Sequence, residues 1–60
     1  QRVDDPANVY QNLAGVLLQL GRRERAAQAL ERAIEAHEAR GRSGAAERLR
    51  QRLRQLSGGG

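Results

Sequence analysis

Few side chains in this chain of 60 residues could take part in catalysis or bind a metal. His37 is the one histidine, and the sequence offers no second histidine and no cysteine to complete a metal site. Asp4 and Asp5 precede Pro6, where the capping of a helix explains both carboxylates. The segment Gly41-Arg42-Ser43-Gly44 lacks the glycine and lysine pattern of a phosphate-binding loop. We therefore predict no enzyme activity, no metal and no cofactor, and we interpret His37 as a packing or capping residue.

Arginine is the other residue type in this chain whose side chain could bind a partner. All 11 basic residues are arginines, which against 7 acidic residues give a formal net charge of +4. Four of them alternate with leucine and glutamine near the C-terminus, and at about 100° per residue they spread around a helix. We interpret them as a solvated face, or alternatively as contacts for an acidic partner or a polyanion such as nucleic acid. These four are Arg48, Arg50, Arg52 and Arg54.

Three amphipathic helices are expected to position these side chains. The first begins at the Asp5 cap and ends at Gly21, which suits a left-handed helix cap. Its apolar positions recur at three- and four-residue spacing, at Tyr10, Leu13, Ala14, Leu17 and Leu20. The second helix is predicted from about Arg23 to Ala39, with a stripe of Ala26, Ala29, Leu30, Ala33, Ile34 and His37.

The third helix is predicted from Ser43 to about Leu56, and its stripe repeats that of the first helix. The apolar residues Ala46, Leu49, Leu53 and Leu56 follow Tyr10, Leu13, Leu17 and Leu20 of the first helix at a constant offset of 36 residues. The chain therefore reads as one and a half copies of a two-helix unit. The third helix either caps this unit or begins a further repeat.

Residues Ala7 to Arg40 resemble a tetratricopeptide repeat, a helix–turn–helix unit of about 34 residues. The resemblance rests on Tyr10, Leu13-Ala14, Gly21, Ala26, Leu30 and Ala33, which match its spaced large and small sites. Ala14 replaces a usual glycine, Leu17 stands where an aromatic residue is common, and Glu38 stands where proline would end the repeat. Without that proline the second helix can run on, as in the longer repeats of kinesin light chains and many bacterial signalling proteins.

The resemblance implies an all-α fold, a helical hairpin followed by a third helix. The expected divisions are a lead-in and cap at 1–5, the hairpin at 6–40, the arginine-rich helix at 41–56 and a glycine-rich tail at 57–60. A chain this short buries only about 60% of its unfolded surface, and 10 of its apolar residues are alanines. We therefore expect a homo-oligomer or a piece of a longer array.

The function that the resemblance implies is protein–protein interaction, as a scaffold or adaptor that binds a peptide or copies of itself. Peptides would lie along a concave face formed by Asn8, Gln11, Asn12, Gly15, Leu18 and Gln19, with Leu18 exposed. A basic module that binds nucleic acid is the alternative. No apolar run approaches the roughly 20 residues of a transmembrane helix, and the N-terminus has no signal-peptide pattern. We expect a cytoplasmic protein that does not bind membranes.

Overall fold

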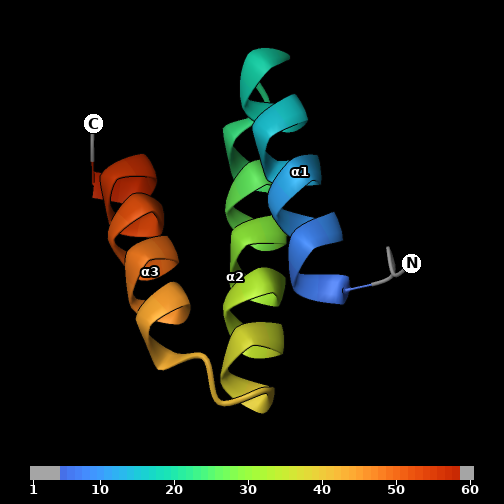
Figure 1. The fold of residues 1–60 in the computed structure, drawn as a ribbon. Coiled ribbons are helices and arrows are strands. Elements are labelled where there is room, and N and C mark those ends of the chain that lie inside the picture. Colours follow the sequence, from blue (N-terminus) through green and yellow to red (C-terminus); the bar gives the residue numbers. More distant parts are fainter. Residues whose placement is uncertain (1–4, 59–60) are drawn as a thin grey trace.

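The computed structural model describes residues 5–58, which form three antiparallel helices joined by short turns (Figure 1). Helix α1 spans Pro6–Gln19, α2 spans Arg23–Ala39 and α3 spans Ser43–Gly58. The all-α prediction of a hairpin plus a third helix is confirmed. Helix α3 runs two residues beyond Leu56, into the segment expected to be a tail. The proposed capping role of Asp4 lies outside the described residues, as does the tail at 59–60.

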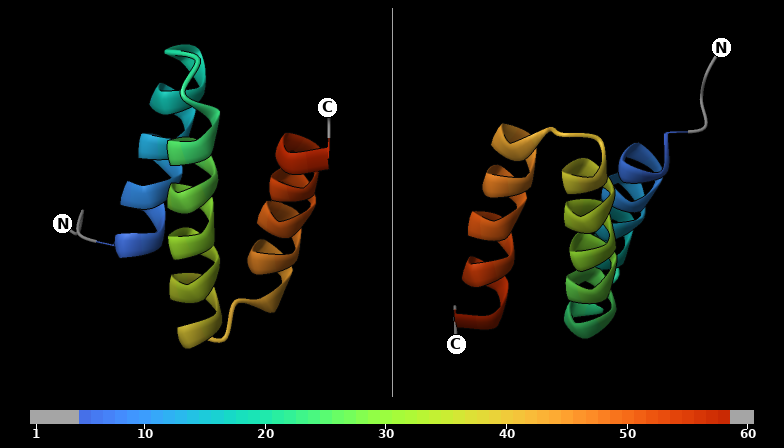
Figure 2. Two further views of the ribbon diagram at one scale, coloured as in Figure 1. Left: turned by 180° about the vertical axis from the view of Figure 1, so that it is seen from behind. Right: turned by 90° about the horizontal axis from the view of Figure 1, so that it is seen from below.

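The three helices lie side by side in one layer, with α2 in the middle (Figure 2). The molecule measures 35 × 21 × 12 Å, and its smallest dimension is close to the diameter of a single helix. Helices α1 and α3 each pack against α2 and make no direct backbone contact with each other within residues 5–58. Both broad faces of the layer are therefore open to solvent.

The helix ends follow the residue types that the sequence places there. Asp5 caps α1 by accepting a hydrogen bond from the Ala7 amide at 3.2 Å, and Pro6 takes the first helical position. Gly21 and Gly41 follow α1 and α2 with φ values of 78° and 75°, a left-handed conformation that suits glycine. In both turns the next residue donates back into the last helical turn, Arg22 to Leu17 and Arg42 to His37, each at 2.8 Å.

Helix α2 supplies the centre of the core. All six residues of its predicted stripe are buried, from Ala26 to His37, so this prediction is confirmed. Leu30 is its largest fully buried side chain, at 1% exposure. The alanines allow the neighbouring helices to approach closely, and Leu30 and Ile34 fill the space between them.

The predicted stripe of α3 also faces the core. Ala46 and Leu49 are buried, while Leu53 and Leu56 are partly buried and pack against the same cluster. Leu53 and Leu56 stay partly open because α3 has only one neighbouring helix, α2. One layer of helices cannot enclose a large side chain on every side.

The predicted stripe of α1 is wrong at Leu13 and Leu20, which are 45% and 65% exposed. The buried arc of α1 is centred on Ala7 and Ala14 instead, with Tyr10 and Leu17 partly buried beside them. The apolar residues of α1 occupy two adjacent faces of the helix, and α2 covers only one of these faces. Alanine lies at the contact because it lets the two backbones come closest.

Leu18 corrects a second expectation about α1. It was predicted to be exposed, but it is partly buried. At about 100° per residue it lies within about 40° of Ala14, on the side that faces α2. The exposed apolar residues are on the other flank of the buried arc.

Candidate functional site

Helix α1 exposes a row of large apolar side chains on the flank that α2 leaves open. We call this row the α1 apolar stripe, and its exposed fractions are 52%, 45%, 53% and 65% for Val9, Leu13, Val16 and Leu20. The spacing of four, three and four residues places them along one line of the helix. Exposed apolar rows of this kind are typical of protein–protein, membrane or ligand-binding sites.

Helix α1 is also free of charge. None of its residues from Pro6 to Gln19 is acidic or basic, whereas α2 has three arginines and four glutamates and α3 has four arginines and one glutamate. A helix that is apolar around most of its circumference is ordinarily buried on more than one side. Sequence reasoning missed Val9 and Val16, although the run of uncharged residues was the signal that could have found them.

A groove of 320 Å³ runs beside the α1 apolar stripe, between α1 and α2. Its floor contains apolar side chains of both helices, and arginines and a glutamine of α2 form its edge. Its lining consists of Tyr10, Leu13, Leu17, Arg25, Gln28, Ala29 and Arg32. The stripe and the groove together offer a continuous surface that suits the apolar side of another helix.

The structure divides the predicted peptide-binding residues into two groups. Asn8, Asn12, Gly15 and Gln19 are exposed and, at about 100° per residue, share one side of α1. Gln11 and Leu18 are partly buried nearer to α2. A Cβ atom added at Gly15 would meet nothing within 4 Å, so no neighbour within the described residues requires glycine there.

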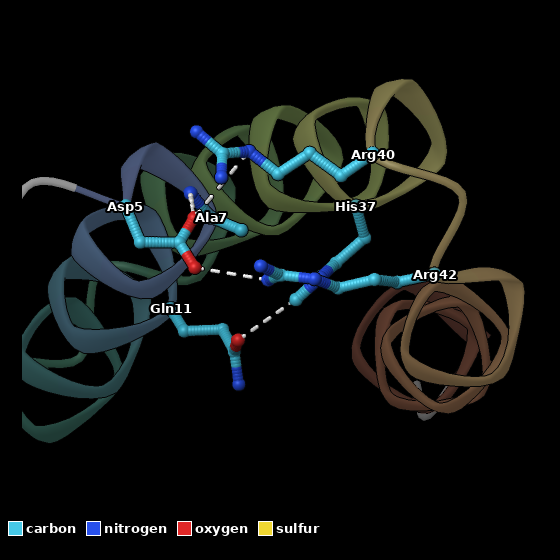
Figure 3. Close-up of polar contacts among 6 residues, drawn as sticks. All are labelled: Asp5, Ala7, Gln11, His37, Arg40 and Arg42. Atoms are coloured by element: carbon cyan, nitrogen blue, oxygen red, sulfur yellow. Dashed lines mark hydrogen bonds and ion pairs between the residues drawn. The ribbon is translucent and has the colours of Figure 1, made fainter.

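Gln11 is held by a hydrogen bond with His37 (Figure 3). The distance between Gln11 Oε1 and His37 Nε2 is 3.0 Å, and His37 is only 6% exposed. His37 thus packs in the core, as interpreted from its place on the α2 stripe, and also links α2 to α1. This link was not visible in the sequence, because the two residues are 26 positions apart.

Asp5 forms a second polar link at the same end of the molecule (Figure 3). Its carboxylate accepts a hydrogen bond from Arg42 Nη1 at 2.9 Å, and Arg40 Nε lies 4.0 Å away. The bond from Arg42 lowers the pKa of Asp5 below its ordinary value, helped by the Ala7 amide and the nearby positive charges and opposed by partial burial. The start of α1 is therefore tied to the turn between α2 and α3.

The four arginines proposed as a polyanion contact do not share one environment. Arg50 pairs with Glu38 and lies 3.9 Å from Glu47, measured from Nη1 to Oε1. Arg54 borders a groove of 480 Å³ that it shares with Arg50 and three glutamates, Glu31, Glu35 and Glu38. Arg48 and Arg52 instead border a different pocket, together with Gln11 and His37.

The described residues give no sign of a metal centre or a membrane span. No group of three or more histidine, cysteine or acidic side chains gathers within residues 5–58. None of the helices in that part of the chain has the length and apolar character needed to cross a bilayer.

Comparison of the chain with protein-family models, with curated proteins and with solved structures gave no match.

Proposed function

We propose that this chain is a protein–protein interaction module that associates with a second copy of itself through the α1 apolar stripe. The observation that carries the proposal is that α1 has no charge and has apolar residues on two faces, of which α2 covers one. Burying the second face removes apolar surface from water, which favours association by roughly 25 cal/mol per Å² before the costs of binding.

The distribution of charge favours a second copy as the occupant. Each chain has a formal net charge of +4, so two copies repel each other at long range. Contact between the two α1 helices brings no charge of α1 into the interface, and the arginines nearest to it, Arg25 and Arg32, line the groove beside the stripe. The most common arrangement of two identical chains is two-fold, in which the same patch serves both partners.

The shape of the molecule supports the same conclusion. In a layer only 12 Å thick the outer helix α3 has one neighbouring helix, so Leu53 and Leu56 stay partly open. In a dimer the groove beside the stripe would receive apolar side chains of the partner, over Tyr10, Leu17 and Ala29. The edge arginines Arg25 and Arg32 can keep their charged ends in water while their stems cover apolar surface.

We also propose that the hairpin is a tetratricopeptide-like unit. Its support is the pattern of residues that first suggested the resemblance, in which Ala14 and Ala26 occupy small sites and are both buried. Repeat units of this kind are incomplete alone and are stabilised by stacking on a neighbour. Self-association through α1 would supply that neighbour.

The test is the solution mass of the protein, measured by sedimentation equilibrium across concentration, with helicity recorded on the same samples. We expect a helical dimer that loses helicity on dilution. Leu13→Arg should abolish the dimer, because it places a charge in the stripe. The matched control Asn12→Arg adds the same charge to the neighbouring exposed position outside the stripe and should leave the dimer intact.

Two outcomes would count against self-association. A wild-type protein that stays monomeric and fully helical over the whole range would show that the open face of α1 needs no second copy. Equal effects of Leu13→Arg and Asn12→Arg would show that net charge, and not the stripe, controls assembly. Either result would direct attention to peptide binding on the side of α1 that contains Asn8, Asn12 and Gln19.

A further inference from the structure

A small pocket lies where residues of all three helices come together. It has a volume of 250 Å³ and is separate from the α1 apolar stripe. The pocket is lined by Gln11 of α1, His37 of α2 and four residues of α3, Ala45, Arg48, Leu49 and Arg52. Its lining contains two guanidinium groups, an imidazole and an amide, and no acidic side chain.

His37 borders this pocket and has one ring nitrogen without a partner in the described residues. The residue is 6% exposed, and its Nδ1 atom is buried with no hydrogen-bond partner within residues 5–58. Buried ring nitrogens ordinarily have a partner, because leaving one unsatisfied is costly. Gln11 Oε1 accepts from Nε2, so Nε2 donates and Nδ1 of the neutral ring has a lone pair. To donate to a bound oxyanion as well, the ring must carry a proton on both nitrogens.

Arg48 and Arg52 add positive charge to the pocket, and no carboxylate of the described residues pairs with either of them. They are four residues apart in α3 and therefore on one side of it, and both are exposed. Neither has an ion pair with a described residue, whereas Arg40, Arg42 and Arg50 each lie within 4.0 Å of a carboxylate. The larger groove beside Arg50 and Arg54 is lined by three glutamates as well, of which Glu38 pairs with Arg50.

From these observations we infer that the pocket formed by Gln11, His37, Arg48 and Arg52 binds a single oxyanion group, a phosphate or a carboxylate. Both groups accept several hydrogen bonds at once and match the planar donors of arginine. The division of the four arginines, of which only Arg48 and Arg52 border this pocket, suits one such group and not a run of phosphates. This site uses no residue of the α1 apolar stripe, so the test of the site is independent of the test of self-association.

The experiment is a titration of the isotope-labelled protein at constant ionic strength, followed by nuclear magnetic resonance. The probes are inorganic phosphate and acetate, with chloride as the reference ion. We expect saturable shifts at the His37 ring and the Gln11 side chain with phosphate, acetate or both, and none with chloride. Saturation by phosphate alone identifies a phosphate site, and saturation by acetate alone identifies a carboxylate site. No saturable shift with either probe would overturn the inference.

Two double variants of equal charge separate this pocket from a general attraction. Arg48→Gln with Arg52→Gln should weaken binding of the saturating probe at least tenfold. Arg50→Gln with Arg54→Gln removes the same two charges from the other side of α3 and should change it less than twofold. Equal weakening by the two double variants, with phosphate or with a single-stranded oligonucleotide, would overturn the inference in favour of attraction to the whole helix.

His37 is tested by a substitution that keeps its link to α1. His37→Gln retains an amide that can reach Gln11 but has no group at the place of Nδ1, so we expect binding to weaken at least fivefold. Asn carries its amide near the place of Nδ1, and His37→Asn should therefore weaken binding less than His37→Gln. Helicity measured on each variant confirms that it is folded. Unchanged binding in a folded His37→Gln variant would contradict the role of the imidazole.

Discussion

Arg42 Nη1 donates to Asp5 Oδ2 at 2.9 Å and so joins two residues that are 37 positions apart (Figure 3). Asp5 is the cap of α1, and Arg42 lies between α2 and α3. One carboxylate therefore caps the start of α1 on one side of the layer and holds the turn that leads to α3 on the other side. Helices α1 and α3 have no direct backbone contact within the described residues, so this bond links the start of α1 to the turn from which α3 begins.

The first prediction concerns acid. The pKa of Asp5 is lowered in the folded protein, chiefly by the hydrogen bond from Arg42, so the folded state binds this proton less tightly than the unfolded chain does. The stabilisation is fully present above the ordinary value of 3.8 and is lost as the pH falls through the lower folded pKa. Thermal unfolding at about pH 6 and about pH 2.5 should show a larger drop in Tm for the wild type than for Asp5→Asn.

Asparagine is the informative substitution at this position, because it caps helices as well as aspartate does and removes only the charge. Asp5→Ala removes the cap as well and should lower Tm further at every pH. Glu35→Gln, which removes an exposed mid-helix carboxylate with no ion pair in the described residues, serves as the control and should show the acid response of the wild type. An Asp5→Asn variant with the full wild-type acid response would contradict the assignment.

A second prediction separates two glycines. Gly15 lies inside α1, where an added Cβ meets nothing within 4 Å, so Gly15→Ala should stabilise the protein by about 0.5–1 kcal/mol. Gly21 has a φ of 78°, which strains any residue with a Cβ, so Gly21→Ala should destabilise it by about 1–2 kcal/mol. Chemical denaturation measures both changes. Destabilisation by Gly15→Ala would indicate a partner that approaches the helix closely at this point.

The third prediction concerns the centre of the core. Leu30 is 1% exposed, so Leu30→Ala should cost about 2–5 kcal/mol through lost burial and the cavity that it leaves. A domain of this length has a total stability of roughly 3–9 kcal/mol, so the variant should be partly or fully unfolded at room temperature. Glu31→Ala changes the next, exposed residue and should shift stability by less than about 0.5 kcal/mol. Circular dichroism during urea unfolding measures both variants.

The fourth prediction concerns the attachment of α3. Leu49 is 5% exposed and packs in the core cluster, so Leu49→Asp buries an unpaired charge and should detach α3 from α2. Because α3 contacts no other helix in the described part of the chain, helicity should fall by at least its share, about a third. Gln51→Asp introduces the same charge at an exposed position of the same helix and should keep the wild-type helicity. Unchanged helicity in Leu49→Asp would refute the packing of α3.

Local features of the fold followed from residue types alone. Asp5 and Pro6 begin α1, Gly21 and Gly41 occupy the turns, and α2 covers the range that its periodicity predicted. These features depend on interactions within a few residues, such as a capping hydrogen bond or a positive φ. Such interactions are nearly the same wherever the sequence pattern occurs.

The sequence by itself determined three helices and the inward faces of α2 and α3. The small and branched residues of α2 form a single stripe, and a neighbour on either side of α2 buries that same stripe. Only the tertiary structure decided which of the two apolar faces of α1 is covered, and it placed Leu13 and Leu20 outside. Periodicity shows how many apolar faces a helix has, but the number and position of its neighbours decide which one is buried. For the same reason the meeting of Gln11, His37, Arg48 and Arg52 emerged only from the packing, which unites residues of three helices in one pocket.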